Sequence, residues 1–176
     1  GSIGDCQNGI FTASAVGTGY IEAAVGDNRA YRGVSVYADY TEIKNSFEEE
    51  GTASVVATEN ARGSFHITTD QFEEGKTSGE LIYDFYNAGG LGEASLFFAG
   101  QGISLTEDTA ALALQVYNTH ENNNRILGEV LDEAGKKYQV EFTDNLDWTG
   151  WKKTEASLEN IQSPAFLTRV YVVSSD

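Results

Sequence analysis

Two tryptophans lie three residues apart in the stretch DNLDWTGWKK, residues 144–153. An indole ring can stack on the C–H face of a sugar, and it can equally fill the edge of a β-sheet core. Gly150 permits a tight turn directly before Trp151, which favours a core-edge position for that ring. Trp148 belongs to the loop itself, so we expect Trp148 to be the candidate for sugar stacking.

Polar side chains elsewhere could pair with the hydroxyl groups of the same ligand, because amides, carboxylates, Arg and His all hydrogen-bond to sugar hydroxyls. Gln115 and Tyr117 project from the same face of one predicted strand. The predicted carbohydrate-binding residues are Gln115, Tyr117, His120, Arg125, Glu129, Gln139 and Trp148. If their strands form one concave sheet, these side chains line a groove; the alternative is a solvated face with ordinary cross-strand pairs.

Catalytic patterns are weak in this sequence. Glycoside hydrolysis needs two carboxylates about 5 to 9.5 Å apart, and a chain with 27 Asp and Glu residues meets that spacing by accident. The G-x-S-x-G pattern of a nucleophile elbow is absent. Cys6, His66 and His120 are not expected to form a catalytic dyad. The sequence favours a protein that is not an enzyme, with a small glycosidase as the open alternative.

The hydrophobic pattern that must position these residues has a period of two, which is typical of strands with one buried face. In GELIYDFY (79–86), Leu81, Tyr83 and Phe85 share one face. ALALQVYN (111–118) and KYQVEF (137–142) alternate in the same way. Further strand candidates are GSFHITT, EASLFFAG, RILGEVLD and LTRVYVV, whereas SLENIQSP suggests a short helical turn. We therefore expect an all-β fold, an antiparallel two-sheet β-sandwich of the jelly-roll type.

Composition limits the class of partner. The 27 acidic and 11 basic residues give a net charge of −16, and such a field repels phosphate backbones and anionic lipids. Nucleic acid is therefore not an expected partner, and no apolar run is long enough for membrane insertion. The single Cys6 allows no internal disulfide. Neutral ligands and cations remain.

Residues 1–40 differ from the rest, with strand candidates near 10–13, 19–25 and 29–38 punctuated by glycines. Three strands are too few to enclose a core. We expect residues 1–40 to be a partial immunoglobulin-like segment and residues 41–176 to be the jelly-roll module.

Four stretches carry a resemblance to a known family: FEEGKTSGELIYDF, LALQVYNTHENNNRILGEVLDEAGKKYQVEF, NLDWTGWKK and SPAFLTRVYVV. Together they resemble the C-terminal jelly-roll carbohydrate-binding-type module of bacterial secreted phosphodiester glycosidase proteins, relatives of N-acetylglucosamine-1-phosphodiester alpha-N-acetylglucosaminidase. GIFTASAVGTGYIEAAVG is similar to the last strands of the bacterial Ig-like repeat that precedes this module in those proteins.

The resemblance implies an extracellular or cell-surface accessory module that attaches a glycosidase to a polysaccharide or cell-wall glycan. The covalently linked catalytic domain would lie upstream in the native chain. The alternative is a structural or interaction module that packs against that phosphodiester glycosidase domain.

A structural Ca²⁺ is the expected cofactor, since many jelly-roll modules hold one near the first strand, and Ca²⁺ takes six to eight oxygen ligands. By resemblance to such modules, Glu48 is the first candidate, followed by Glu49. The carbonyls of Lys76 and Thr77 could contribute. Asp144, Asp147 or Asp176 could complete the shell. The alternative is that these are ordinary surface carboxylates of an acidic protein.

Overall fold

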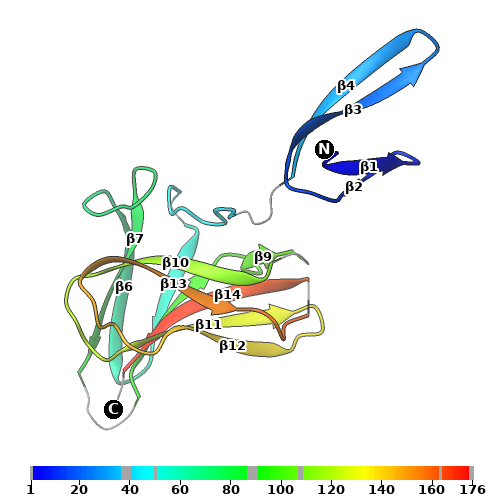
Figure 1. Cartoon of the computed structure of the whole chain (residues 1–176). Helices are drawn as coiled ribbons and strands as arrows, with labels where there is room; N and C mark the ends of the chain where they lie inside the picture. Colours follow the sequence, from blue (N-terminus) through cyan, green and yellow to red (C-terminus); the bar gives the residue numbers. More distant parts are fainter. Residues whose placement is uncertain are drawn as a thin grey trace. The chain divides into compact units, whose positions relative to one another are not determined.

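The computed structural model describes residues 2–36, 41–49, 51–86, 91–106, 109–162 and 164–174. Within these residues all strands pair antiparallel and no helix is present (Figure 1). The all-β class predicted from the alternation is therefore confirmed. The chain divides into two compact units, Gly1–Ile43 and Lys44–Asp176.

The first unit consists of two hairpins. Strand β1 (Gly4–Gln7) pairs with β2 (Ile10–Ala13), and β3 (Gly17–Val25) pairs with β4 (Asn28–Val36). Every described residue of this unit is at least partly exposed. β2, β3 and β4 lie where the sequence predicts strands, although residues 37 and 38 of the third prediction lie outside the described residues.

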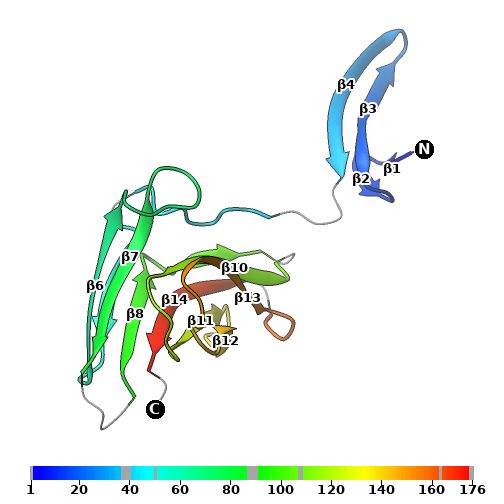
Figure 2. The same ribbon diagram turned by 60° about the vertical axis from the view of Figure 1, so that its left-hand side comes forward.

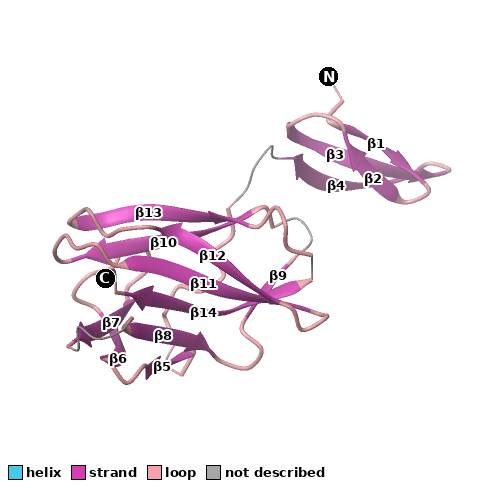
Figure 3. Ribbon diagram, turned by 90° about the horizontal axis from the view of Figure 1, so that it is seen from below, coloured by secondary structure: helices cyan, strands magenta, loops and turns pink. Residues whose placement is uncertain are grey.

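One layer of the second unit is a six-stranded sheet. Its strands are β5 (Ala53–Ala57), β8 (Glu93–Phe98), β9 (Ile103–Leu105), β11 (Arg125–Asp132), β12 (Lys137–Thr143) and β14 (Ala165–Val173). The order is β12-β11-β14-β8-β5, with β9 also paired to β14. Figure 3 shows these strands side by side.

The facing layer consists of two separate pairs, β6 (Ala61–Thr68) with β7 (Ser78–Phe85), and β10 (Ala111–Asn118) with β13 (Gly150–Ser157). Figures 1 and 2 show β10 and β13 lying against β11 and β14. The second unit is thus a β-sandwich whose second layer is divided in two.

The core lies between the layers. Val130, Phe142 and Leu167 of the six-stranded sheet belong to a buried cluster, against which Leu114 and Val116 of β10 pack. On β7, Leu81, Tyr83 and Phe85 face the same cluster, whereas Glu80, Ile82 and Asp84 are exposed. The alternation predicted for residues 79–86, 111–118 and 137–142 is therefore confirmed.

Three strands of the second unit have no counterpart among the predictions: β5, β9 and β13. The stretch SLENIQSP also differs from its prediction. Ser157 ends β13, and the next residues make a turn in which Ile161 N donates to Leu158 O at 2.9 Å. Its described residues contain no helix, and Leu158 is buried, with its N–H donating to Ala110 O at 3.0 Å.

Candidate functional site

The outer face of the β10–β13 pair carries an exposed group of aromatic and polar side chains. Tyr117 lies opposite Trp151, and Gln115 lies opposite Lys153. Directly paired residues project from the same face of a sheet. Gln115 and Lys153 are exposed, Tyr117 retains 36% of its accessible surface and Trp151 is half-buried. As expected from the sequence, Gln115 and Tyr117 face away from the core.

The two rings form an edge-to-face pair. The ring centroids of Tyr117 and Trp151 are 5.3 Å apart and the ring planes meet at 65°, a geometry that favours contact between the edge of one ring and the face of the other. The strand that carries Tyr117 is anchored, because its inward-facing residues Leu114 and Val116 pack on the core. A rigid aromatic corner therefore lies beside amide and ammonium groups.

The two tryptophans have exchanged the positions expected of them. Trp148 packs against the core cluster, and its indole Nε1 is buried without a hydrogen-bond partner among the described residues. Lys152 Nζ covers its ring at 4.4 Å from the centroid. Trp151 instead lies on the outer face, because the turn at Gly150 (φ 88°) starts β13 in register with Tyr117. The expectation that Trp148 is the ring presented to solvent is corrected accordingly.

Asn118 fixes the two loops beside this aromatic corner. Its Nδ2 lies 2.8 Å from His120 O, 3.2 Å from Leu146 O and 2.6 Å from Trp148 O. Asn118 is 8% exposed, so these bonds form where water cannot replace them. The residue joins the end of β10 to the loop that leads into β13.

The predicted carbohydrate-binding residues are divided between two surfaces. Gln115 and Tyr117 belong to β10, and His120 lies exposed in the following loop, where Nδ1 is 3.0 Å from Thr119 Oγ1. Arg125, Glu129 and Gln139 belong to the six-stranded sheet. The single groove expected from the sequence is therefore not formed, because β11 and β12 belong to the six-stranded sheet, whereas β10 belongs to the facing layer.

Arg125 and Glu129 are both engaged in ion pairs on that second surface. Arg125 pairs with Glu141 on the neighbouring strand, and this hydrogen bond raises the pKa of the guanidinium. Burial opposes ionisation of Glu129, but hydrogen bonds from Lys137 and Thr168 and the charge of Arg169 outweigh it and lower the pKa of the carboxyl. Arg169 was not found by sequence reasoning, since only the β11–β14 register places it opposite Glu129.

The structure brings Glu48, Lys76 and Thr77 together. Glu48 Oε1 accepts hydrogen bonds from Lys76 N at 2.7 Å and Thr77 N at 3.2 Å. The bond from Lys76 N is the main cause that lowers the pKa of Glu48, and burial opposes it. Lys76 and Thr77 thus direct their N–H groups to the carboxylate, whereas the groups predicted to bind Ca²⁺ are their carbonyl oxygens.

Of the other predicted ligands, one forms an ion pair and one lies outside the described residues. Asp147 pairs with Lys152 at 3.3 Å, and Asp176 lies outside the described residues. Among the residues that the structure describes, no group of three His, Cys, Asp or Glu side chains is arranged to hold a metal ion. The structural Ca²⁺ therefore stays a prediction.

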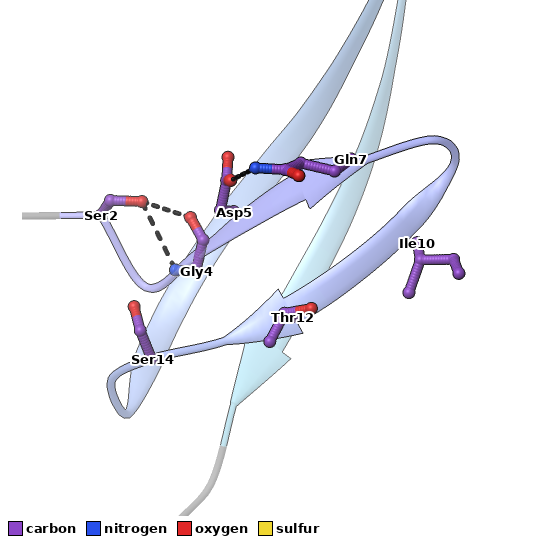
Figure 4. Close-up of a pocket in the computed structure, with 7 residues that line it drawn as sticks. All are labelled: Ser2, Gly4, Asp5, Gln7, Ile10, Thr12 and Ser14. Carbon is purple, nitrogen blue, oxygen red and sulfur yellow. Dashed lines mark hydrogen bonds between the residues drawn. The ribbon is translucent and has the colours of Figure 1, made fainter.

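The first unit has an open hollow of its own. It has a volume of about 680 Å³ and is lined only by residues between 2 and 14 (Figure 4). Its polar groups pair with their near neighbours: Gln7 Nε2 donates to Asp5 Oδ2 at 2.8 Å, and Ser2 Oγ donates to Gly4 O at 2.5 Å. The hollow is the open side of one hairpin and brings together no distant parts of the chain.

Comparison with models of known protein families finds no match, and comparison with the curated proteins finds no significant match. No described part of the chain forms a helix of the length and apolar character needed to cross a membrane. Functional inference therefore depends on the geometry of the two outer surfaces of the sandwich.

Proposed function

We propose that the second unit is a non-catalytic module that binds a neutral glycan on the outer face of β10 and β13. The observation that supports this proposal is the exposed edge-to-face pair of Tyr117 and Trp151 next to Gln115 and Lys153. A sugar offers a C–H patch to an aromatic ring and hydroxyls to amide and ammonium groups. This face supplies both kinds of group within two adjacent strands.

The net charge favours a neutral ligand over an acidic polysaccharide. A chain of charge −16 repels polyanions. Lys153 Nζ on this face forms an ion pair with Glu155 Oε1 at 2.6 Å, so its charge is already compensated. In keeping with the resemblance described above, we propose an extracellular or cell-surface role, in which the module attaches a linked glycosidase to a polysaccharide or cell-wall glycan.

The proposal is tested by screening neutral plant and bacterial polysaccharides and then measuring Kd by calorimetry. Tyr117→Ala and Trp151→Ala are each expected to weaken binding about tenfold, equivalent to about 1.4 kcal/mol. Tyr117→Ala should change the melting temperature little because Tyr117 is exposed, whereas Trp151→Ala should lower it because Trp151 is half-buried.

A matched control comes from the first unit, where Tyr20 and Tyr31 form a similar edge-to-face pair with centroids 5.5 Å apart. Tyr20→Ala should leave Kd unchanged. Equal affinity in Tyr117→Ala, Trp151→Ala and the parent protein would disprove the assigned face, and a screen without any binder would disprove the function.

A second candidate function is that of an interaction module that packs against another protein domain. The exposed apolar side chains of the first unit favour it, since Ile10 and Val25 retain 69% and 81% of their accessible surface. Such hairpins gain stability when an apolar partner covers them. This candidate predicts no glycan affinity and a higher melting temperature for the first unit when a catalytic domain is linked upstream.

A further inference from the structure

A polar cleft lies on the outer face of the six-stranded sheet. It has a volume of about 220 Å³ and is lined by Glu129, Lys137, Tyr138, Gln139, Arg169 and Tyr171. These residues come from β11, β12 and β14, which lie side by side (Figure 3). The cleft is smaller than the roughly 300 to 1,000 Å³ of sites for drug-sized ligands, so its size suits one sugar unit.

The charges of this cleft compensate one another. Arg169 Nη1 donates to Glu93 Oε1 at 2.5 Å and to Ser95 Oγ at 2.9 Å, and Arg169 Nη2 donates to Glu129 Oε2 at 3.3 Å. Lys137 Nζ lies 3.1 Å from Glu129 Oε1. Because each cation already faces a carboxylate, the cleft has no unpaired charge to attract a phosphate or a metal ion.

Hydrogen-bonding capacity nevertheless remains. The exposed side-chain amide of Gln139 and the hydroxyl of Tyr171 make no hydrogen bond with another described residue. Gln139 lies directly opposite Glu129 on the neighbouring strand. Glu129 Oε1 already accepts bonds from Lys137 and Thr168, whereas Oε2 accepts one from Arg169 and can accept another. The Tyr171 hydroxyl is protonated at neutral pH and can donate, and burial raises its pKa further. Donors and acceptors for neutral hydroxyl groups are thus available together.

The cleft and the aromatic corner face away from each other. The sheets that carry them enclose one core, in which Leu114 of β10 and Val130 of β11 belong to the same hydrophobic cluster. Side chains on the outer faces of two packed sheets point in opposite directions. One short oligosaccharide therefore cannot occupy both places.

We propose that the cleft around Gln139, Glu129 and Tyr171 is a second binding site for one neutral sugar unit, so that one module can bridge two glycan chains. The proposal rests on the proposed function, in that both sites take neutral glycans. It goes beyond that function in assigning a second site and a cross-linking activity.

The test uses the full chain and nuclear magnetic resonance, with cellotriose, chitotriose, xylotriose and mannotriose each added at about 10 mM, enough to detect millimolar affinity. The indole N–H of Trp151 reports on the aromatic corner, and the side-chain amide of Gln139 reports on the cleft. Shifts of both reporters with one sugar are expected. Shifts of Trp151 alone would overturn the second site and support the proposed function. Shifts of Gln139 alone would support a site in the cleft and overturn the binding face assigned to β10 and β13. The absence of any shift with any sugar would overturn both the second site and the proposed function.

Variants separate the two sites. Gln139→Ala is expected to weaken binding at the cleft about tenfold and to leave the Trp151 titration unchanged, and Tyr117→Ala should do the opposite. Gln139 is exposed and unbonded, so its replacement should preserve folding; Glu129→Gln is the second variant, checked by thermal melting. The parent protein should aggregate a soluble polysaccharide that carries the active sugar, and each of Gln139→Ala and Tyr117→Ala should abolish aggregation. Aggregation that persists in Gln139→Ala would overturn the bridging role.

Discussion

At the scale of single residues, Asn118 has the most constrained position near the proposed binding face. One amide nitrogen lies within hydrogen-bond distance of three backbone carbonyls from two loops. An amide NH₂ has only two hydrogens, so the third carbonyl shares a donor. The position of Trp151 follows from this arrangement, since Asn118 pairs with Gly150, the residue before Trp151.

Replacing Asn118 by Ala should lower the free energy of unfolding by about 1 to 3 kcal/mol, because buried carbonyls lose their donor. It should also weaken glycan binding, since the loop before Trp151 loses its attachment. Urea unfolding and calorimetric titration measure the two effects. Asn123→Ala is the control, because Asn123 is exposed. An equal effect of both substitutions would argue against the role given to Asn118.

Glu48 should make stability depend on pH. A carboxyl whose pKa is lower in the folded chain than in the unfolded chain stabilises the fold above its unfolded pKa, and this contribution is lost as pH falls through the folded pKa. The ordinary value for Glu48 is 4.5, so the loss should begin near that pH and continue below it.

Glu48→Gln should therefore flatten the acid limb of a plot of unfolding free energy against pH, measured with urea from neutral pH to below 4.5. Glu49→Gln is the control, since the Glu49 side chain makes no hydrogen bond with another described residue. If Glu48→Gln retains the acid limb of the parent protein, the two backbone hydrogen bonds to Glu48 do not cause the pH dependence of stability.

At the scale of strands, local patterns predicted which side chains face the core and failed to predict which strands are neighbours. The period of two correctly placed Leu81, Leu114 and Phe142 inward. It could not assign β10 to β13 or β11 to β14, because strand pairing is set by contacts between distant parts of the chain.

The errors at the candidate site follow from the same limit. The predicted groove requires Gln139 and Tyr117 to lie on one concave sheet, yet β10 pairs with β13 and β11 pairs with β12. Trp148 and Trp151 were assigned the wrong way round, since only the register of β13 with β10 shows which ring faces outward.

Gly63 should be essential for the packing of β6. A Cβ atom added there would lie 2.8 Å from Val55 Cγ1 and 3.6 Å from Ala94 Cβ. Gly63→Ala is expected to lower the free energy of unfolding of the second unit by about 1 to 3 kcal/mol, measured with urea, because overpacking forces the two strands apart.

The matched control is Gly33→Ala on β4, where an added Cβ meets no atom within 4 Å. Gly33→Ala should leave the unfolding of the second unit unchanged. Equal stability of Gly63→Ala and the parent protein would show that β6 can move away from β5 without cost.

At the scale of the whole molecule, the two units differ in how much they bury. The second unit has a core that includes fully shielded Val130 and Leu105, whereas every described residue of the first unit is partly exposed. A unit with few buried apolar contacts opens at a low free energy. The two units should therefore differ strongly in resistance to proteolysis.

Brief digestion with thermolysin under native conditions should remove the first unit and leave a fragment that begins near Lys44, identified by mass spectrometry. The fragment should retain one cooperative unfolding transition. If the residues before Ile43 survive as long as the sandwich, the first unit has a stability that its exposure does not explain.

The angle between the two rings at the proposed site also selects the physical form of the ligand. Planes that meet at 65° cannot both lie flat on one crystalline surface, since stacking on such a lattice requires coplanar rings. A single hydrated strand can instead pass over one ring and bend along the edge of the other. The module should therefore prefer dissolved or amorphous polymer to the faces of insoluble fibres.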